Sequence, residues 1–530
     1  MIIMKELPIG MSTFSEIIED DYVYVDKTQY IYEMVKRRKT YFLSRPRRFG
    51  KSLLISTLEE IFKGNKKLFK GLYIHDKWPL KDKHPVIRLD LSNIAHETPE
   101  ILKQSLEDFI IGIADKYNIT LKKRFLNPKF NELIEKIYEK KGKKVVVLID
   151  EYDDPIIGSI KNIEIAKKNQ EILSKFYRVL KANDKYLRFI FLTGVTKFSK
   201  TSIFSGLNNL EDITLDSDFA DICGYTQEEL EKHFGEYINK LINEKSISCE
   251  QLLSAIKEWY NGYSWNGENR LYNPYSILNL FTGGIFDNYW FETGTPTLLM
   301  NFIKTHTVDV KFLLNQEIII SGGFLNFTIE SMDFITLLLQ TGYLTIKNLD
   351  IPPTDLPIYE LTIPNREVSQ SLFKCIVNEL SSQSSVEIEV LAKDILNAIN
   401  NVDNKLLQKS FDILTSTIPS LQYGKVKEDI REVNYHIWFL SWFSLMGFSV
   451  SGEESTSHGS LDMVLKRDNL VVICEFKYSL NIPLDDLALE AINQIKKYEY
   501  YKPYLNKDVV LIGIAFGDRK CKSKIEKLQI

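Results

Sequence analysis

Cysteine is scarce in this sequence of 530 residues, with five in all, and no two of them form a CxxC pair or a zinc-binding spacing. This scarcity excludes a small secreted domain stapled by disulfides, and free thiols are typical of a reducing compartment. No uncharged apolar run reaches the roughly 18 residues that a membrane helix needs, and MIIMKELPIG lacks the apolar centre of a signal peptide. We therefore expect a cytoplasmic protein with no membrane partner.

An excess of either charge is also missing, since 67 basic residues stand against 71 acidic ones and the net charge is −4. Composition alone therefore gives no electrostatic argument for a nucleic-acid partner, which would need a local basic groove instead. Hydrophobic residues make up 44% of the chain and charged residues 26%, as in ordinary globular proteins. The length exceeds what one hydrophobic core supports, so we expect about two to four domains.

One stretch, Tyr41–Ser52, has the pattern of a phosphate-binding loop, YFLSRPRRFGKS. A short apolar strand opens it, and apolar residues at helical spacing follow in Leu53–Phe62. In this context loop N–H groups and the helix N-terminus cradle the phosphates of ATP, Lys51 neutralises their charge, and Ser52 holds Mg²⁺. The general pattern has glycine where this chain has Arg45, so a Gly-Lys-Ser at an ordinary helix start is the alternative.

Two further apolar strands end in polar groups and favour the ATPase interpretation. Val145–Glu151 is an unbroken apolar run that ends in two acids, typical of a parallel sheet covered on both faces. Asp150 is suited to holding Mg²⁺ and Glu151 to polarising the attacking water, because ligands bind at the carboxyl ends of such strands. Arg188–Gly194 is the third strand, and its Thr193 lies where a sensor of the γ-phosphate is expected.

Four segments together carry a family resemblance: YVDKT (Tyr24–Thr28), SRPRRFGKS (Ser44–Ser52), VVVLIDEYDDPI (Val145–Ile156) and FLTGVTKFSKTSIFSGLNNL (Phe191–Leu210). They resemble the AAA-ATPase-like family of prokaryotic proteins, which commonly joins its ATPase to a C-terminal PD-(D/E)xK nuclease-like domain. That family's loop normally reads RPRRFGKS, so Arg45 departs from the general pattern and not from the family's. The resemblance implies that Arg48, Phe49 and Gly50 bind ATP together with the loop residues named above.

Other segments are less decisive. The resemblance places Asp26 beside the nucleotide, but we favour it as the cap of the following helix. Thr226 with Glu229 forms a capping box at the start of a helical region, where the resemblance implies a lid. Aromatic residues in Trp259–Trp265 suit base stacking or a small core, and we favour the core. Asp333–Pro364 has the helix–strand–loop–strand order of a winged helix.

A second candidate site lies in the last hundred residues. Two predicted strands joined by a two-residue turn, DN, place Asp462 directly opposite Glu475. Strand alternation then puts Lys477 on the same face as Glu475 and turns Phe476 toward the core. Two carboxylates and an ammonium group suit a hard cation and an activated water, which is the D…ExK signature of PD-(D/E)xK nucleases. A surface ion-pair cluster at a sheet edge is the alternative.

Helices predicted on both sides of this hairpin support the site. Asp429–Phe448 carries Glu432, which the resemblance implies as a further metal ligand. Ala488–Tyr501 would bring Gln494 and Tyr498 near the strands. The family tends to carry a small-residue and arginine pattern before its aspartate, where this chain has HGSL, and this difference leaves the substrate contacts open.

We predict an α/β protein: a P-loop NTPase parallel sheet with a helical lid and winged-helix-like region, and a C-terminal α/β restriction-endonuclease-like domain. The predicted domains are the AAA-like ATPase (1–225), the lid and winged-helix-like region (226–380), a helical connector (381–424) and the nuclease-like domain (425–530).

The predicted function couples ATP binding and hydrolysis to Mg²⁺-dependent phosphodiester cleavage, with DNA favoured as the substrate, in defence or mobile-element biology. Glu151 serves the ATPase, while Asp462, Glu475 and Lys477 serve the nuclease. The alternative is a regulatory, signal-transducing ATPase whose nuclease-like domain is an inactive platform for nucleic acid or protein. The sequence leaves open a homo-oligomeric assembly.

Overall fold

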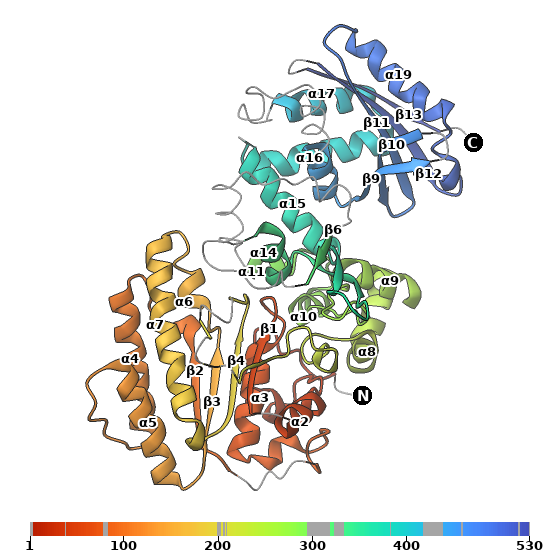
Figure 1. Ribbon diagram of the computed structural model, residues 1–530. Helices are drawn as coiled ribbons and strands as arrows, with labels where there is room; N and C mark the ends of the chain where they lie inside the picture. The colour runs from red at the N-terminus through yellow and green to blue at the C-terminus, as the bar shows by residue number, and fades with distance from the viewer. Residues whose placement is uncertain are drawn as a thin grey trace. The chain divides into compact units, whose positions relative to one another are not determined.

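The computed structural model describes residues 4–37, 39–77, 83–198, 203–204, 207, 209–293, 318–322, 333–381, 383–416, 438–456, 459–517 and 520–528. The chain forms two compact units, which we describe separately (Figure 1). Unit 1 holds Met1–Leu299 with Ile319–Pro364, and unit 2 holds Met300–Ile318 with Asn365–Ile530. The predicted boundaries at 225, 380 and 424 stay predictions, because compactness does not test which segments fold independently. Among the described residues, none of the helices combines the length and the apolar character that spanning a membrane requires.

A five-stranded parallel sheet forms the centre of unit 1, in the order β2-β3-β4-β1-β5. This confirms the predicted parallel sheet. Strand β4 lies between the phosphate-loop strand and the strand that ends in acids, and the carboxyl ends of all three meet at one edge. The strands are β1 (Thr40–Ser44), β2 (Val86–Asp90), β3 (Val145–Asp150), β4 (Leu187–Gly194) and β5 (Glu211–Asp212).

Helices cover both faces of this sheet, which explains why its central strands are apolar throughout. Every residue of β1 and β3 is buried, and each fully buried branched side chain contributes roughly 1.5–3 kcal/mol. In Figure 1, α4, α5 and α7 lie on one side of the sheet and α3 on the other. The helices are α1 (Phe14–Glu19), α2 (Thr28–Arg37), α3 (Lys51–Lys63), α4 (Pro99–Lys116), α5 (Leu126–Lys141), α6 (Asp154–Ile157) and α7 (Ile163–Ala182).

Two predicted helix starts can be checked directly. The Asp26 carboxylate accepts a hydrogen bond from the Thr28 backbone N–H at 2.8 Å, which confirms it as the cap of α2. The Asn-Pro pair at residues 127 and 128 predicts a helix that Asn127 caps and that begins at Pro128. This prediction is wrong, because α5 already begins at Leu126. Pro128 is therefore the third helical residue and not the first, a position where its missing N–H still has no partner within the helix.

The lid region of unit 1 is helical, and its aromatic residues form a core as predicted. The capping box between Thr226 and Glu229 is present, and Tyr260 and Tyr263 are buried. The residues of Asp333–Pro364 have the predicted helix and two strands, and a further strand completes a three-stranded sheet in the order β6-β8-β7. The elements are α8 (Gln227–Lys245), α9 (Cys249–Tyr260), α10 (Pro274–Gly283), α11 (Tyr289–Thr293), β6 (Ile318–Ser321), α14 (Phe334–Thr341), β7 (Thr345–Asp350) and β8 (Ile358–Thr362).

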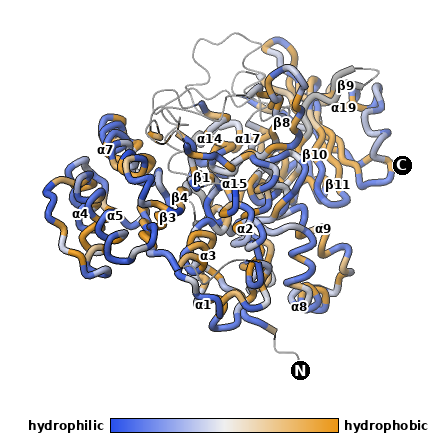
Figure 2. Tube along the Cα trace, turned by 60° about the horizontal axis from the view of Figure 1, so that its bottom comes forward, coloured by the Kyte–Doolittle hydropathy of each residue, from blue (hydrophilic) through white to orange (hydrophobic). Residues whose placement is uncertain are grey.

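Unit 2 is built on a mixed sheet in the order β13-β12-β11-β10-β9, and its strand β11 is largely apolar (Figure 2). Helix α19 packs closely on β12, because a Cβ atom at Gly513 would lie 2.2 Å from the Ala488 carbonyl oxygen. The elements are α15 (Arg366–Leu380), α16 (Ser385–Asn401), α17 (Asn404–Ser416), β9 (Ser449–Thr456), β10 (Gly459–Arg467), β11 (Leu470–Tyr478), α19 (Leu484–Lys497), β12 (Asp508–Phe516) and β13 (Cys521–Lys527).

Candidate active sites

The loop between β1 and α3 has the backbone of a phosphate cradle. Gly50 has φ of 93°, a left-handed conformation that favours glycine, and α3 begins at the next residue. A Cβ atom at Gly50 would meet nothing within 4 Å, so glycine is needed there for its backbone conformation and not for space. Arg48 is also left-handed, with φ of 65°. The loop therefore ends at a helix N-terminus, where free N–H groups and the helix dipole attract anions.

Lys51 lies under this loop with its ammonium group held by three oxygens. Its Nζ donates to the Arg45 carbonyl at 3.1 Å and to the Pro46 carbonyl at 3.2 Å, and it lies 3.3 Å from Oε1 of Glu151. The side chain is only 3% exposed. A buried cation held mainly by backbone carbonyls is poorly neutralised, so the site is suited to an anionic ligand.

The acids at the end of β3 lie beside the loop, as predicted. The nearby Ser52 hydroxyl lowers the pKa of Asp150, but burial together with the charge of Glu151 outweighs it and raises this pKa to about 6. Glu151 has φ of 48°, so the chain turns sharply as it leaves the strand. The structure thus brings Lys51, Ser52, Asp150 and Glu151 together at the carboxyl edge of the sheet.

The end of β4 supplies a buried hydroxyl and a fixed loop. Thr193 is fully buried, and its Oγ1 has no hydrogen-bond partner among the described residues. The carboxylate of Asp153 accepts hydrogen bonds from the N–H groups of Val195, at 3.3 Å, and Thr196, at 2.7 Å. Burial and the charge of Glu151 raise the pKa of Asp153 to about 6. Asp153 therefore holds the chain that follows β4.

Arg45 and Phe49 point away from the phosphate cradle. Arg45 is fully buried and donates to the carbonyl oxygens of Ser44, Thr214, Phe219 and Ala220. Its guanidinium also lies 4.1 Å from the ring centroid of Trp265. The Phe49 ring packs edge-on against Tyr263 and Trp265. These side chains join the loop to the rest of unit 1, so only the backbone of Phe49 is available to a nucleotide.

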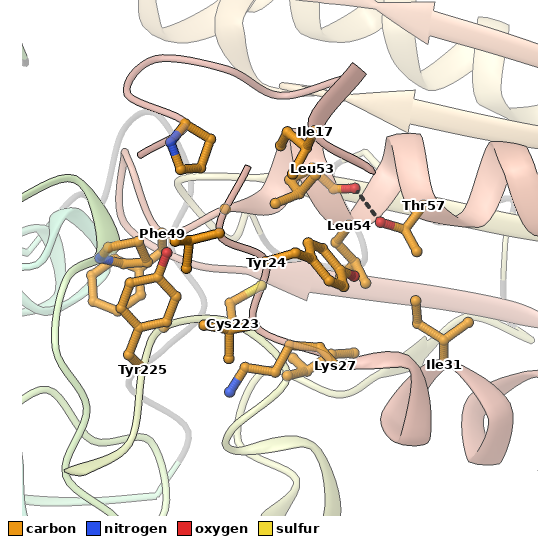
Figure 3. Close-up of a pocket in the computed structure, with 17 residues that line it drawn as sticks. Ile17, Tyr24, Lys27, Ile31, Phe49, Leu53, Leu54, Thr57, Cys223 and Tyr225 are labelled. Atoms are coloured by element: carbon orange, nitrogen blue, oxygen red, sulfur yellow. Dashed lines mark hydrogen bonds between the residues drawn. The ribbon is translucent and has the colours of Figure 1, made fainter. Parts of the chain in front are cut away.

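Two adjoining pockets border the loop. The larger, about 520 Å³, is lined by polar groups that include Arg47, Arg48, Lys51, Ser52, Asp90, Ser92, Glu151 and Asp154. The smaller, about 70 Å³, is mainly apolar and is shown in Figure 3, where Tyr24, Phe49, Leu53, Cys223 and Tyr225 surround it. Both pockets are lined by Pro8, Ile17, Gly50, Leu53, Tyr225 and Pro274. Together they offer a polar end at the loop and an apolar end beside it.

The hairpin of unit 2 has the predicted register, with Arg467 paired to Leu470 and Met463 paired to Cys474. At the next position the carboxylate of Asp462 accepts a hydrogen bond from the Phe476 N–H at 2.7 Å. The Asp462 carboxylate is therefore the hydrogen-bond acceptor at a position where a regular antiparallel ladder has a backbone carbonyl oxygen.

Glu475 and Lys477 meet on one face of β11 through a glutamine of α19. The Gln494 amide donates to Oε1 of Glu475, and its carbonyl oxygen accepts from the Lys477 Nζ at 2.6 Å. Glu475 is 3% exposed, and its Oε2 has no partner among the described residues. Burial and the nearby charge of Asp462 raise the pKa of Glu475 to about 8. Phe476 points to the opposite face and stacks on Phe516, as strand alternation predicts.

Oxygen donors of this kind suit a hard divalent cation. The Oε2 atom of Glu475, which has no partner among the described residues, fits the role of a metal ligand. Burial favours the protonated carboxyl group, and a bound cation would take the place of that proton. Glu432, the further predicted ligand, lies outside the described residues. Within the described part of the chain, no group of three or more His, Cys, Asp or Glu residues is arranged to hold a metal ion.

Comparisons with known proteins agree with both sites. Residues 8–204 match a family model described as "Predicted AAA-ATPase", and residues 430–526 match one described as "PD-(D/E)XK nuclease superfamily". A relative from Azotobacter chroococcum mcd 1, named "Uncharacterized protein in vnfD 5'region", is 36% identical over 520 residues, or 97% of this chain and 96% of the relative. The chain belongs to the AAA-ATPase-like family. Its AAA-ATPase-like part is N-terminal, and its C-terminal part belongs to the PD-(D/E)XK nuclease superfamily.

A comparison with solved structures adds little to this family assignment. It finds a chain of "Structure of Drosophila ORC bound to poly(dA/dT) DNA and Cdc6 (conformation 1)" at 10% identity, covering 81% of this chain and 61% of that one. The TM-score is 0.22, so the likeness carries no argument about fold or function.

Sequence reasoning missed two residues that shape the phosphate-loop site of this AAA-ATPase-like protein. In the sequence, Arg45 is only a departure from the glycine of the general phosphate-loop pattern. In the structure it is buried and anchors the loop. Asp153 stands in the EYDD run, two residues after Glu151, and that run of acids was the only signal of its role.

Proposed function

We propose that this AAA-ATPase-like protein binds and hydrolyses ATP with Mg²⁺ in unit 1 and cleaves phosphodiester bonds of nucleic acid, with DNA favoured, in unit 2. ATP would regulate access to the nuclease site. We place the protein in the cytoplasm, in defence or mobile-element biology, and the five free cysteines are in keeping with a reducing compartment. A homo-oligomeric assembly stays a prediction.

The residues at the phosphate loop fit a magnesium nucleotide. Lys51 would exchange its backbone carbonyl partners for phosphate oxygens, and the hydroxyl of Ser52 and the carboxylate of Asp150 would hold Mg²⁺. The cation withdraws charge from the phosphates. Burial disfavours the ionised form of Asp150 and raises its pKa to about 6, and a cation beside this carboxylate would stabilise the ionised form. Released from Lys51, Glu151 would accept a proton from the attacking water at Oε1, while the Thr193 hydroxyl would contact the γ-phosphate.

The base of the nucleotide would enter the apolar pocket of Figure 3, beside the loop. An apolar cleft with a few polar groups suits a purine ring. Cys223 lines this pocket and is buried, and burial raises the pKa of its thiol. We expect a small alkylating reagent to modify the exposed Cys249 first and Cys223 slowly, with ATP slowing Cys223 further. Mass spectrometry of the labelled peptides measures both rates, and unchanged Cys223 labelling with saturating ATP would contradict this base position.

In unit 2, each residue of the site would have a separate role in phosphodiester cleavage. Asp462 and Glu475 would hold the divalent cation, which supplies a Lewis acid and lowers the pKa of bound water. Lys477 would stabilise the charge that develops on the phosphate or hold the attacking water. Gln494 keeps Lys477 and Glu475 in place through its amide. The observation that carries the nuclease proposal is the unpartnered, buried Oε2 of Glu475 beside Lys477.

A cleavage assay on plasmid and single-stranded DNA with Mg²⁺ or Mn²⁺ tests both halves of the proposal. We expect metal-dependent cutting that Lys477→Ala abolishes, while Lys524→Ala, an exposed lysine on β13, leaves it unchanged. ATP should change the rate in the wild type and not in Lys51→Ala. Cutting that survives in Lys477→Ala would refute the assigned site, and an ATP effect that persists in Lys51→Ala would refute the coupling.

The second candidate function is a regulatory ATPase whose nuclease-like unit is an inactive platform for nucleic acid or protein. One observation favours it: no complete three-ligand metal group exists within the described residues. Tight DNA binding by the wild type with no cutting under any metal condition would support this candidate over the nuclease.

A further inference from the structure

Glu151, the residue proposed to accept the proton of the attacking water, has a backbone conformation that glutamate rarely adopts. Its φ of 48° is left-handed, and a residue with a Cβ atom has a higher free energy there. Such a conformation persists only where the surrounding structure holds the backbone in place. The next residues in the chain, Tyr152 and Asp153, are both buried. The position of Glu151 therefore depends on how these two neighbours are held.

Tyr152 is fixed first through its backbone. Its N–H donates to the carbonyl oxygen of Thr193 at 3.0 Å, so the residue after Glu151 is hydrogen-bonded to the residue expected to contact the γ-phosphate. Its carbonyl oxygen accepts a hydrogen bond from the hydroxyl of Tyr177, in α7, at 3.2 Å. Its ring packs edge-on against the Phe42 ring of β1, with centroids 5.3 Å apart. The end of β3 is thus attached to β4, α7 and β1 through one residue.

The hydroxyl of Tyr152 reaches the chain beyond β4. It donates to the carbonyl oxygen of Thr196 at 3.0 Å and accepts a hydrogen bond from the Phe198 N–H at 3.2 Å. Because a hydroxyl has one hydrogen to donate, this pair of bonds sets its orientation as well as its position. Buried hydrogen bonds of this kind make the segment rigid. The hydroxyl therefore joins the turn after β3 to the chain after β4.

The two segments approach so closely that Gly194 has no room for a side chain. A Cβ atom there would lie 2.2 Å from Oδ1 of Asp153 and 2.6 Å from the Tyr152 ring. The φ of Gly194 is not left-handed, so glycine is needed for space and not for its backbone conformation. Because protein interiors are close-packed and transmit strain, a shift of the Tyr152 ring would displace the ends of both strands.

We propose that Tyr152 is a positioning residue of the ATPase site, whose hydroxyl and backbone N–H hold Glu151 and Thr193 in fixed positions relative to each other. This inference rests on the proposed ATPase function. Tyr152 is fully buried and lines neither of the two pockets at the loop, so it acts on the reaction through the residues that it holds. Its hydroxyl bonds go to the chain after β4 and not to the phosphate loop, so ATP binding does not depend on them.

Tyr152→Phe removes the hydroxyl and keeps the ring. Tyr117→Phe is the matched control, because the Tyr117 hydroxyl also makes two backbone hydrogen bonds. They join it to the N–H of Val86 at 3.0 Å and to the carbonyl oxygen of Val86 at 2.9 Å, at the opposite edge of the same sheet.

Steady-state ATP hydrolysis by the full chain with Mg²⁺ gives kcat and KM for each variant. We expect Tyr152→Phe to lower kcat about ten- to hundredfold with KM for ATP unchanged, since small misplacements of reacting groups have effects of this size. Gly194→Ala, which displaces the Tyr152 ring from the other side, should lower kcat in the same way. Tyr117→Phe should retain the wild-type kcat and KM.

The outcomes separate this inference from the function on which it rests. A wild type that binds ATP without hydrolysing it would refute the ATPase proposal, and the positioning role with it. Hydrolysis by the wild type with an unchanged kcat in Tyr152→Phe would refute the positioning role alone. Equal losses of kcat in Tyr152→Phe and Tyr117→Phe would also overturn it, because both would then follow from reduced stability. A higher KM with an unchanged kcat would assign the hydroxyl to ATP binding instead.

Discussion

Asp150 and Glu475 are carboxyl groups near the ends of buried strands, and burial raises the pKa of each. Each also has a second acid nearby, Glu151 beside Asp150 and Asp462 beside Glu475, whose charge raises the pKa further. Such groups destabilise the fold in their ionised form, and natural proteins keep them where a cation or a proton-transfer step uses them. At the scale of single residues, both sites therefore carry a cost in stability.

Glu475→Gln measures that cost. The pKa of Glu475 rises from 4.5 to about 8 on folding, so in this window the unfolded chain is ionised while the folded protein holds a proton. The stability of the metal-free protein is therefore fully present below pH 4.5 and falls as the pH rises toward 8. We expect Glu475→Gln to raise the free energy of unfolding of unit 2 more at pH 8 than at pH 5, by on the order of a few kcal/mol. Glu490→Gln, an exposed acid on α19, should show no such gain.

Arg45→Met tests the anchor of the phosphate loop. Burial lowers the pKa of Arg45 to about 10, so it stays charged at neutral pH, and its removal leaves the carbonyl oxygens of Thr214, Phe219 and Ala220 without this donor. We expect unit 1 to lose about 1–3 kcal/mol in urea unfolding for each carbonyl oxygen that stays buried without a donor. The exposed Arg47 is the control, and equal losses in Arg45→Met and Arg47→Met would refute this role.

At the scale of elements, close backbone approaches decide where functional side chains lie. Helix α14 contacts the loop directly, because a Cβ atom at Gly342 would lie 2.8 Å from the Pro46 ring. Gln340 of the same helix accepts a hydrogen bond from the Lys197 N–H at 2.8 Å, just after the sensor strand. The winged-helix-like part of unit 1 is thus attached to both the loop and the end of β4.

Gly513→Ala tests the corresponding approach in unit 2. The new Cβ would lie 2.2 Å from the Ala488 carbonyl oxygen, a backbone atom, so α19 must move away from the sheet. We expect a lower Tm for unit 2 and weaker Mn²⁺ binding, because Gln494 would leave Glu475 and Lys477. Gly112→Ala in α4 meets nothing within 4 Å and should stabilise unit 1 by roughly 0.5–1 kcal/mol. Wild-type stability of Gly513→Ala would contradict the tight packing.

At the scale of the whole molecule, two units with separate cores carry two separate candidate sites. Ligands that bind one folded unit stabilise that unit by mass action, whatever the other does. Calorimetry can therefore assign each ligand to a unit, provided that a substitution in one unit shifts, and so identifies, the unfolding transition of that unit. Gly513→Ala marks unit 2 for this purpose.

We expect ATP with Mg²⁺ to stabilise unit 1 by about 2.7 kcal/mol when its concentration is about 100 times the dissociation constant, and so to raise the temperature of the unit 1 transition. Lys51→Ala should abolish this shift, because the Lys51 Nζ donates to two carbonyl oxygens of the loop, while Lys477→Ala should leave it intact. A shift that Lys51→Ala retains would place the nucleotide elsewhere. A shift of both transitions together in the wild type would show that the two units are energetically coupled.

The sequence by itself determined what depends on local spacing. The phosphate loop, the buried acid-bearing strand and the hairpin register follow from residues a few positions apart, since strand alternation and turn length fix them. Asp26 as a cap and the capping box at Thr226 are local in the same way. The start of α5 was wrong because an Asn-Pro pair is compatible with more than one helix start.

Only the tertiary structure decided which distant groups complete these motifs. Arg45 donates hydrogen bonds to carbonyl oxygens about 170 positions away in the sequence. Gln494 of α19 accepts a hydrogen bond from Lys477 of β11. Such contacts depend on how elements pack and not on the pattern within any one of them, so no spacing in the sequence specifies them.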